Sequence, residues 1–464
     1  MWANFFIHLT LVGSFLLLSE IGSPSDSRLI QETRTRRIAY LQRVEGGITL
    51  LFNSLHHDLD EYVPDKSFYY LTGCAEPGAV LLLTPGEDAP QETLFLAKRD
   101  SRQEQWTGPR MGPGRDTARR LGIQQVLNLD ELPTTITERV PPRGKVYANL
   151  PLLSHRESTG DCCLEPWVRL CRWLPHANIL DAGPEVAFLR MKKSEWEIKK
   201  IRRAVEITMA GHRHALSAIA PGRFEYEVEA AIEYQFRSQG ATGPAFPSIV
   251  GSGLNATILH YAENNRRMSS GDLVVIDVGA EFEGYSADVT RTYPVSGRFT
   301  HRQKEIYNIV LAAQKAALKQ VRPGVKFDRS GPIHQAAFET IDSHGRDRQG
   351  RGLGRYFIHG TGHHLGLEVH DPVSDLGRPL EPGMVITIEP GIYIPEENLG
   401  VRIEDDVLVT RDGYRILSQE LPREAEEIEK MIREKREGVD FQEIVDLAQE
   451  QVVTETQEVG GLGL

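Results

Sequence analysis

Cysteine is scarce in this chain, which has only 4 cysteines among its 464 residues. A disulfide-stapled scaffold of this length would need many more, so that class of protein is excluded. Cys74, Cys162, Cys163 and Cys171 also form no CxxC pair and no Cys/His pair at the spacing of a zinc site. Any metal that the protein binds is therefore expected to have oxygen and imidazole ligands.

Long hydrophobic runs are lacking as well. The one run that resembles a targeting segment, residues 5–18 (FFIHLTLVGSFLLL), has 14 residues and is short for a bilayer span. No Lys or Arg precedes Arg28, and Glu20 stands where a cleavage site needs a small residue. A signal peptide and an over-extended N-terminus both stay open for residues 1–27. We expect no stable membrane anchor and a cytoplasmic protein, or a secreted or periplasmic one if residues 1–23 are a signal peptide.

Positive charge is in the minority, with 53 Lys and Arg against 65 Asp and Glu and a formal net charge of -12. This balance argues against a nucleic acid partner. A chain of 464 residues with 40% hydrophobic residues is expected to form two or three domains. Its last segment, residues 437–464, is acidic and rich in Gln, and it predicts a weak helix with a frayed tail.

Between the two ends, the hydrophobic pattern predicts two domains of different type. Over residues 28–185, short apolar runs alternate with amphipathic stretches, as in an α/β domain. A helix is predicted at 191–209 because Ser194 and Glu197 have the spacing of a capping box. It opens an α+β domain over residues 186–436, with further helices expected at 226–239 and 303–321 and strands at 272–279, 286–293, 384–389 and 401–410.

Two aspartates in this second domain lie on either side of a turn signal. Asp277 and Asp288 are eleven positions apart and nearly symmetric about Glu283 and Gly284. A hairpin would bring them roughly opposite each other, with Cβ atoms about 5 Å apart. An aspartate pair at this spacing is by itself better explained as a strand end or a turn start. Asp277, however, lies inside the apolar run VVIDVG, where an unpaired carboxylate is costly to bury. Two carboxylates that close, however, repel each other unless a cation lies between them.

Histidines gather in residues 357–372 (FIHGTGHHLGLEVHDP), which hold 4 of the 15 histidines of the chain. The glycines of this segment miss the GxGxxG spacing of a phosphate-binding loop. The segment therefore indicates metal binding or proton transfer, without indicating which histidine is the ligand.

Two glutamates are set into apolar strands, Glu389 in MVITIEPG and Glu404 in GVRIEDDVLV. For either one alone, a solvated strand edge is as good an explanation as a functional site. Their combination with the aspartates and histidines is typical of a metal site.

Together these motifs resemble the pita-bread metallopeptidases, and among them the aminopeptidase P family. The resemblance extends from about residue 28 to about residue 436. It implies a creatinase-type N-terminal domain followed by a pita-bread catalytic domain that holds the metal site. The segments that carry it are ILHYAEN at 258–264, IDVGAEFEGYSADVTRTYPVSGRFT at 276–300, HGTGHHLGLEVHD at 359–371, EPGMVITIEPGIY at 381–393 and GVRIEDD at 400–406.

The resemblance implies two divalent metal ions with five ligands. Asp288 and Glu404 would bridge the ions, His363 and Glu389 would complete one site, and Asp277 would chelate the other. A set of oxygens with one imidazole suits Mn²⁺, with Zn²⁺ and Co²⁺ as alternatives. A metal-bridging hydroxide would attack the peptide, and Glu389 would accept its proton and pass it to the leaving nitrogen.

Further residues are implied around the metals. His260 and His370, with Glu389, would be catalytic, because the two histidines would contact substrate or the tetrahedral intermediate. A tryptophan of the N-terminal domain would reach the site of a neighbouring subunit, which implies a homo-oligomer, either a dimer or a tetramer. The residues expected to bind substrate are His260, His359, His370, Tyr393, Arg402 and Trp106.

The implied reaction removes the first residue from a peptide whose second residue is proline. The bond before proline has no N–H and is awkward for general peptidases, so it calls for a dedicated site. Prolidase, which has the same ligands and acts on Xaa-Pro dipeptides, stays an alternative. A non-catalytic pita-bread binding protein ranks below both, because such proteins typically lack the ligand set.

Overall fold

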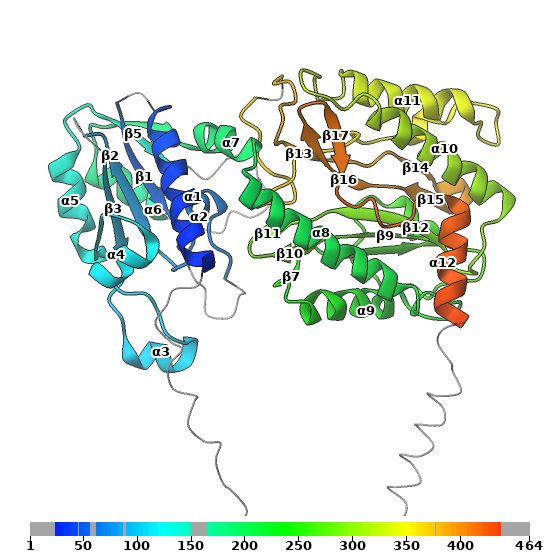
Figure 1. Ribbon diagram of the computed structural model, residues 1–464, viewed down its shortest axis with the longest axis horizontal. Coiled ribbons are helices and arrows are strands. Elements are labelled where there is room, and N and C mark those ends of the chain that lie inside the picture. Colours follow the sequence, from blue (N-terminus) through cyan, green and yellow to red (C-terminus); the bar gives the residue numbers. More distant parts are fainter. Residues whose placement is uncertain are drawn as a thin grey trace, which may run out of the picture. The chain divides into compact units, whose positions relative to one another are not determined.

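The computed structural model describes residues 24–44, 46–55, 62–86, 90–149, 165–375 and 377–437. The chain divides into two compact units, Met1–Leu189 and Arg190–Leu464, and each has a hydrophobic core of its own (Figure 1). Residues 1–23, for which a signal peptide and an over-extended N-terminus both stay open, and nearly all of the acidic tail lie outside the described residues. Among the described helices, none combines the length and the apolar character that a membrane span requires.

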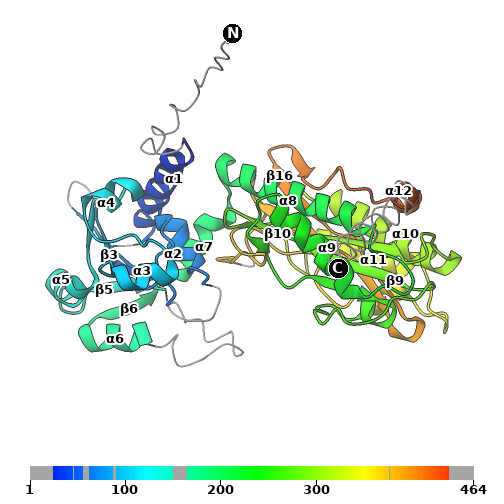
Figure 2. The ribbon, with the colours of Figure 1, turned by 90° about the horizontal axis from the view of Figure 1, so that it is seen from below.

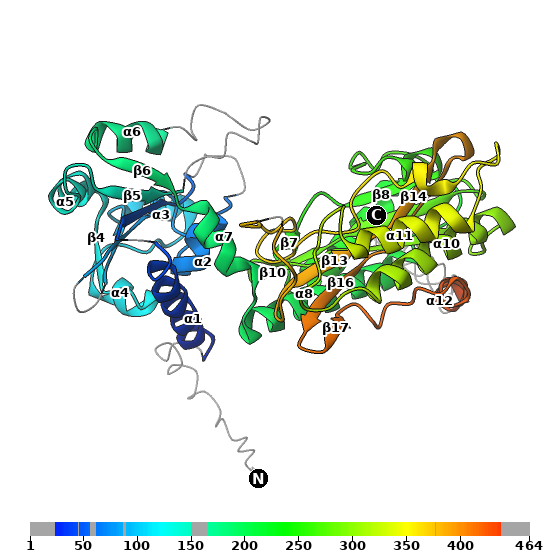
Figure 3. The same cartoon turned by 90° about the horizontal axis from the view of Figure 1, so that it is seen from above.

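Unit 1 contains a six-stranded mixed sheet in the order β4-β3-β2-β1-β5-β6. Helices α1, α2 and α4 cover one face of this sheet, and α5 and α6 cover the other (Figure 2 and Figure 3). The apolar run ITLLF at 48–52, one of the short runs of this domain, forms strand β1. The elements are α1 (Pro24–Leu41), β1 (Ile48–Phe52), α2 (Lys66–Thr72), β2 (Val80–Thr84), β3 (Gln91–Leu96), α3 (Ser101–Thr107), α4 (Arg115–Leu121), β4 (Gln125–Asn128), α5 (Leu132–Arg139), β5 (Lys145–Ala148), α6 (Glu165–Trp173), β6 (Asn178–Asp181) and α7 (Gly183–Met191).

Unit 2 combines long helices with several short antiparallel sheets, ordered β11-β10-β7, β12-β9-β8, β13-β16-β17 and β14-β15. Helix α8 packs against α9 and β10, and α10 packs against α11 and β15. The elements are α8 (Glu195–Ala215), α9 (Glu225–Ser238), β7 (Gly243–Pro244), β8 (Ile249–Ser252), β9 (Leu273–Val278), β10 (Ala280–Phe282), β11 (Tyr285–Ser286), β12 (Val289–Pro294), α10 (His301–Leu318), α11 (Pro332–His344), β13 (Val385–Ile388), β14 (Gly391–Ile394), β15 (Leu399–Arg402), β16 (Asp405–Thr410), β17 (Gly413–Ile416) and α12 (Ala425–Glu437).

The predicted capping box is present at the start of α8. The Ser194 side chain accepts a hydrogen bond from the Glu197 N–H, and the Glu197 carboxylate accepts one from the Ser194 N–H. These bonds satisfy two of the N–H groups that a helix start leaves without partners, which is why the sequence pattern located this helix well.

The two aspartates are close to the expected place but are not directly opposite each other. The turn does form at Glu283 and Gly284, whose φ values are 49° and 84°, but it belongs to the small β10–β11 hairpin. In the antiparallel pair of β9 and β12, Asp277 faces Thr290. Asp288 is therefore a diagonal neighbour of Asp277 on the same face of the sheet, because side chains alternate along a strand.

The prediction of a single strand at 401–410 is wrong, because this segment forms two strands that belong to different sheets. The chain leaves the β14–β15 sheet after Arg402 and joins the β13–β16–β17 sheet at Asp405. Glu404 lies at this crossing, where its N–H donates to the carbonyl of Thr290 in β12 at 3.1 Å. The change of sheet thus brings Glu404 beside the strand that follows Asp288.

Candidate metal centre

A pocket of about 390 Å³ opens in unit 2, where the ends of several strands meet the histidine-rich loop. Ten of the eleven residues expected in the functional site line it: His260, Asp277, Asp288, His359, His363, His370, Glu389, Tyr393, Arg402 and Glu404. The eleventh, Trp106, is on α3 of unit 1, and its side chain is 89% exposed.

Three of the expected ligands converge on one point. Asp288, His363 and Glu404 each offer one ligand atom, and these atoms all lie within 4.8 Å of one another. The Nε2 atom of His363 is 3.3 Å from Asp288 Oδ2 and 3.5 Å from Glu389 Oε1. Carboxylates around one imidazole nitrogen form a donor set that suits a divalent cation.

The fifth expected ligand, Asp277, is held by an arginine. Arg402 Nη2 donates to Asp277 Oδ2 at 2.6 Å, which leaves Oδ1 for another partner. Asp277 Oδ1 and Asp288 Oδ1 are both buried, and neither has a hydrogen-bond partner among the described residues. Because buried carboxylate oxygens are almost always satisfied, these two atoms fit a site that receives cations.

The carboxylates of the pocket perturb one another. Burial, and after it the charge of Asp277, raises the pKa of Asp288 well above its ordinary value. Burial, followed by the charge of Asp288, raises the pKa of Glu404 in the same way. Burial would also raise the pKa of Asp277, but Arg402 outweighs it and holds that pKa below its ordinary value. The pocket thus concentrates negative charge, and a divalent cation would relieve the repulsion.

These pKa shifts predict how pH changes the stabilisation by metal. Because the pKa values of Asp288 and Glu404 are raised, these two groups hold more protons in the metal-free folded protein than in the unfolded chain above pH about 4. The contribution of these two groups to stability therefore falls as pH rises through their folded-state pKa values, whereas a metal ion competes with protons and binds more tightly at high pH. We expect added Mn²⁺ to raise the Tm more at pH 8 than at pH 5, as measured by calorimetry. The difference between the Tm values of the Mn²⁺-loaded and the metal-free protein cancels the effects of pH that both forms share. An equal Tm gain at both pH values would contradict the prediction.

Thr290 supports Glu404 from the strand behind it. Its hydroxyl donates to Glu404 Oε2 at 2.6 Å and accepts from Arg402 Nε at 3.2 Å. Thr290 is fully buried, so water does not replace these bonds.

Removing the Thr290 hydroxyl is expected to weaken metal binding. In a Thr290→Val variant the side-chain volume is kept but Glu404 loses the donor that orients it, so we expect Mn²⁺ affinity to fall by about 10- to 100-fold. Isothermal titration of the metal-free protein measures this change. Thr290→Ser, which keeps the hydroxyl, is the control, and a Thr290→Val affinity equal to that of the control would contradict the assignment.

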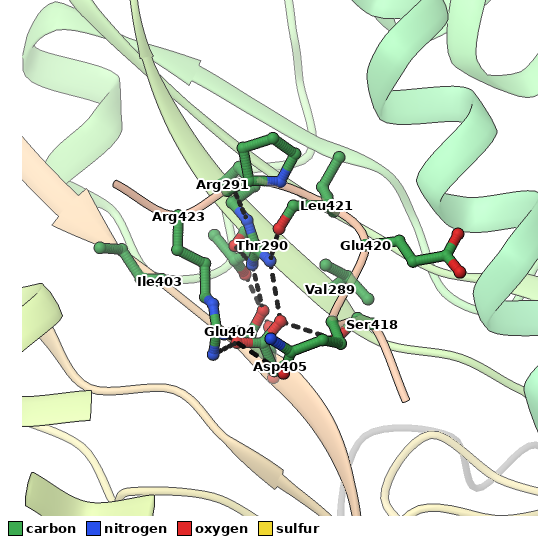
Figure 4. A network of polar contacts seen from close by, with 12 residues as sticks. Val289, Thr290, Arg291, Ile403, Glu404, Asp405, Ser418, Glu420, Leu421 and Arg423 are labelled. Atoms are coloured by element: carbon green, nitrogen blue, oxygen red, sulfur yellow. Dashed lines mark hydrogen bonds and ion pairs between the residues drawn. The ribbon is translucent and has the colours of Figure 1, made fainter. Parts of the chain in front are cut away.

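A fully buried ion pair fixes the backbone around Glu404. Arg291 donates to Asp405 Oδ1 at 2.8 Å and to the carbonyl of Glu404 at 2.6 Å (Figure 4). It also donates to the carbonyls of Thr290, Leu421 and Pro422, so all five N–H groups of the guanidinium have partners. Asp405 in turn accepts from Ser418, Gln314 and Arg423.

Two histidines of the pocket are held as neutral groups. Burial, with Arg402 next in importance, lowers the pKa of His359 to about 3, and burial lowers the pKa of His370 to about 4. Arg402 Nη1 donates to the Tyr393 hydroxyl at 2.9 Å, and that hydroxyl is 2.8 Å from His359 Nε2. A hydroxyl that accepts from an arginine is free to donate to a neutral imidazole. The His370 ring meets the His363 ring edge to face, with centroids 4.3 Å apart.

A second ion cluster fixes the loop at 359–371. The Asp371 carboxylate accepts from Arg190 Nη2 at 2.7 Å and from Lys193 Nζ at 3.0 Å. Burial opposes ionisation of Asp371, but these two cations outweigh it and hold its pKa at about 2. Only glycine fits at Gly366, because a Cβ there would lie 2.6 Å from Asp371 Oδ2.

Sequence reasoning missed the apolar wall of the pocket. Phe246, Pro247, Leu259 and Val369 line it beside the charged residues. Leu259 directly precedes His260 and Val369 directly precedes His370, so their positions next to predicted site residues could have indicated them. Phe246 and Pro247 follow a two-residue strand and have no pattern that distinguishes them from a loop.

Comparison with known proteins decides the family. Two family models match the chain, metallopeptidase family M24 over residues 199–411 and the aminopeptidase P N-terminal domain over residues 31–147. The Xaa-Pro aminopeptidase of Haemophilus influenzae is 37% identical over 435 residues, which cover 87% of this chain and 96% of that protein. The chain belongs to metallopeptidase family M24. An Escherichia coli Xaa-Pro aminopeptidase is 36% identical, with coverage of 87% and 97%.

Solved structures agree with this assignment. Zinc-substituted aminopeptidase P of E. coli in complex with product matches with a TM-score of 0.76 at 34% identity, covering 88% of this chain and 99% of that chain. Proline aminopeptidase P II of Yersinia pestis matches with a TM-score of 0.76 at 33% identity, covering 87% and 99%. The predicted fold class, a creatinase-type domain followed by a pita-bread domain, is confirmed. This M24 protein is a metallopeptidase, and membership of the family implies divalent metal ions.

The domain limits 28–185 and 186–436 stay predictions. The two compact units meet between residues 189 and 190, inside helix α7.

Proposed function

We propose that this protein is an Xaa-Pro aminopeptidase that uses two divalent metal ions to hydrolyse the bond before a proline in second position. One observation carries the proposal: four carboxylates and His363 line one pocket, and two of their buried oxygens have no hydrogen-bond partner among the described residues. The 37% identity to an Xaa-Pro aminopeptidase along nearly its whole length supports this substrate class over the dipeptides of prolidase.

The ligand roles are part of the proposal. Asp288 and Glu404 would each hold both ions, His363 and Glu389 would complete one site, and Asp277 would complete the other. Such ions supply, when bound, a nucleophile from water near neutral pH and polarise the scissile carbonyl. We choose Mn²⁺ over Zn²⁺ and Co²⁺ because four carboxylates and one imidazole form a hard ligand set.

Glu389 is proposed as the general base. It is half-buried at the end of β13, where the Thr387 hydroxyl donates to its Oε1 at 3.1 Å. Burial raises the pKa of Glu389, which brings its proton affinity closer to the operating pH. Glu389 accepts the proton of the nucleophile and then delivers it to the proline nitrogen as the bond breaks.

His260 and His370 are proposed to contact the substrate carbonyl and the developing oxyanion. His359, Tyr393 and Arg402 form the wall proposed to receive the proline ring. The neutral imidazole of His359, locked by Tyr393, favours an uncharged ring over a charged side chain. The nitrogen of the scissile bond belongs to proline and has no hydrogen, so the substrate presents no N–H group to this wall.

A substrate comparison tests the proposed function. Purified protein with Mn²⁺ is expected to hydrolyse Gly-Pro-Ala faster than either Gly-Pro or Gly-Ala-Ala, by about tenfold or more. Liberated glycine is measured with Mn²⁺, Zn²⁺ and Co²⁺ in parallel. A preference for Gly-Pro would identify a prolidase instead. If no peptide is cleaved, the protein is better explained as a non-catalytic pita-bread binding protein.

We also propose that the protein is a homo-oligomer, either a dimer or a tetramer. Its support is Trp106, whose large apolar side chain is 89% exposed on the short helix α3. A tryptophan so exposed is a typical contact residue at protein interfaces. Light scattering of the purified protein measures the number of subunits, and a monomer would contradict this part of the proposal.

A further inference from the structure

The loop that carries His260 connects β8 with β9 and forms one rim of the pocket. Leu259, His260 and Ala262 line the pocket, and the His260 side chain is exposed. An exposed histidine has many rotamers and backbone positions open to it unless its loop is fixed. The backbone on both sides of His260 therefore needs an anchor if this side chain is to meet a substrate in one place.

That anchor is a buried carboxylate outside the pocket. Glu225, the first residue of α9, is fully buried. Its Oε1 accepts from the N–H and the hydroxyl of Ser252, both at 2.6 Å. Its Oε2 accepts from the Tyr261 hydroxyl and from the Arg266 N–H, both at 2.8 Å. One carboxylate thus holds Ser252 at the end of β8, Tyr261 next to His260, and Arg266 further along the loop.

Hydrogen bonds from this loop satisfy the buried Glu225 carboxylate. No described residue forms an ion pair with Glu225, and the nearby Arg266 guanidinium is engaged by Asp272 at 2.6 Å. A buried carboxylate without an ion-pair partner is stable only when N–H and O–H groups solvate it. The loop supplies those donors, so the loop conformation and the buried charge stabilise each other.

We propose that Glu225 is a positioning residue that fixes His260 for the substrate. This inference rests on the proposed function, because it assigns Glu225 a purpose only if His260 acts on a peptide. Glu225 does not line the pocket and contacts none of the five proposed metal ligands by any hydrogen bond in the described residues. Its loss should therefore affect catalysis without changing metal affinity.

Glu225→Gln is the test variant, because it keeps the shape of the side chain and removes half of its acceptors. The amide NH₂ must face either the Ser252 N–H or the Arg266 N–H, and two donors cannot bond to each other. One of the two backbone attachments of the loop, at Ser252 or at Arg266, is then released. We expect kcat/KM for Gly-Pro-Ala to fall by about 10- to 100-fold, as for other small displacements of an active-site group.

A double-mutant cycle separates positioning from a general structural effect. If Glu225 acts through His260, Glu225→Gln should cause no further loss of kcat/KM in a His260→Ala background. Mn²⁺ affinity, measured by isothermal titration, should be the same for wild type and Glu225→Gln. Tyr261→Phe is the milder variant if Glu225→Gln fails to fold, and we expect it to lower kcat/KM by about threefold to tenfold.

Glu227→Gln is the matched control, since it makes the same change in the same helical turn. Glu227 accepts from the Phe224 N–H at 2.7 Å and pairs with Arg223, without any hydrogen bond to the loop in the described residues. It should leave kcat/KM unchanged. If the wild type is active, two results would overturn this inference alone. One is full activity of the Glu225→Gln variant, and the other is that Glu225→Gln lowers kcat/KM equally in the wild-type and His260→Ala backgrounds. An inactive wild type would overturn the proposed function and this inference with it.

Discussion

Asp288→Asn is expected to lower kcat/KM for Gly-Pro-Ala by about a thousandfold. Asparagine keeps the shape of Asp288 but offers a metal only one neutral oxygen, and its NH₂ group is a hydrogen-bond donor that cannot ligate a cation. The proposed bridging position would be lost, and with it the charge that holds two divalent ions together.

The same substitution is expected to stabilise the metal-free protein. Burial and the charge of Asp277 raise the pKa of Asp288, so its ionised form is unfavourable in the folded state. Removing that charge relieves the repulsion, and we expect a higher Tm without metal and a smaller Tm gain on adding Mn²⁺. Opposite changes in activity and stability distinguish a functional site from a structural one.

Asp412→Asn provides the control, because it makes the same change at an exposed turn between β16 and β17. It should alter neither activity nor the Tm gain. Retention of wild-type activity by Asp288→Asn would remove this residue from the proposed mechanism.

Arg291→Met is expected to destabilise the protein by about 3–5 kcal/mol, since it removes the fully buried ion-pair partner of Asp405 and leaves only Arg423, which is partly exposed. Arg291 and Asp405 are both fully buried, and burial of the guanidinium is outweighed by Asp405, which keeps the Arg291 pKa above its ordinary value. The free energy of unfolding from urea titration measures the loss. Four backbone carbonyls also lose a donor, among them that of Glu404.

Arg415→Met on the exposed strand β17 is the comparison for this second prediction. A surface substitution of this kind usually changes stability by less than about 0.5 kcal/mol. A loss below about 1 kcal/mol in Arg291→Met would show that the buried network of Figure 4 contributes little to the support of Glu404.

The sequence predicts elements well where local signals determine them. The capping box of Ser194 and Glu197 marks the start of α8, and the run at 48–52 coincides with β1. The break between β15 and β16 was not predictable in this way, because apolar residues continue through Ile403 and only the tertiary pairing shows that the chain changes sheets.

The site residues also differ in whether a local sequence signal marks them. Asp277 and Glu389 stand out because carboxylates within apolar runs are costly to bury. Asp288 stands out because it is nearly symmetric with Asp277 about a turn signal. Thr290 and Glu225 do not stand out: threonine is ordinary in a strand, and glutamate is ordinary in the first turn of a helix. Their importance comes from hydrogen bonds to residues that are distant in sequence, such as Glu404 and Tyr261.

The central claim is that metal ions held in this pocket carry out the hydrolysis, and a metal titration of the chelator-treated protein tests it most directly. Bound Mn²⁺ per chain and the rate of Gly-Pro-Ala cleavage are measured on the same samples. We expect no cleavage without metal, and full activity when two ions are bound per chain. Undiminished cleavage by the metal-free protein would contradict the account.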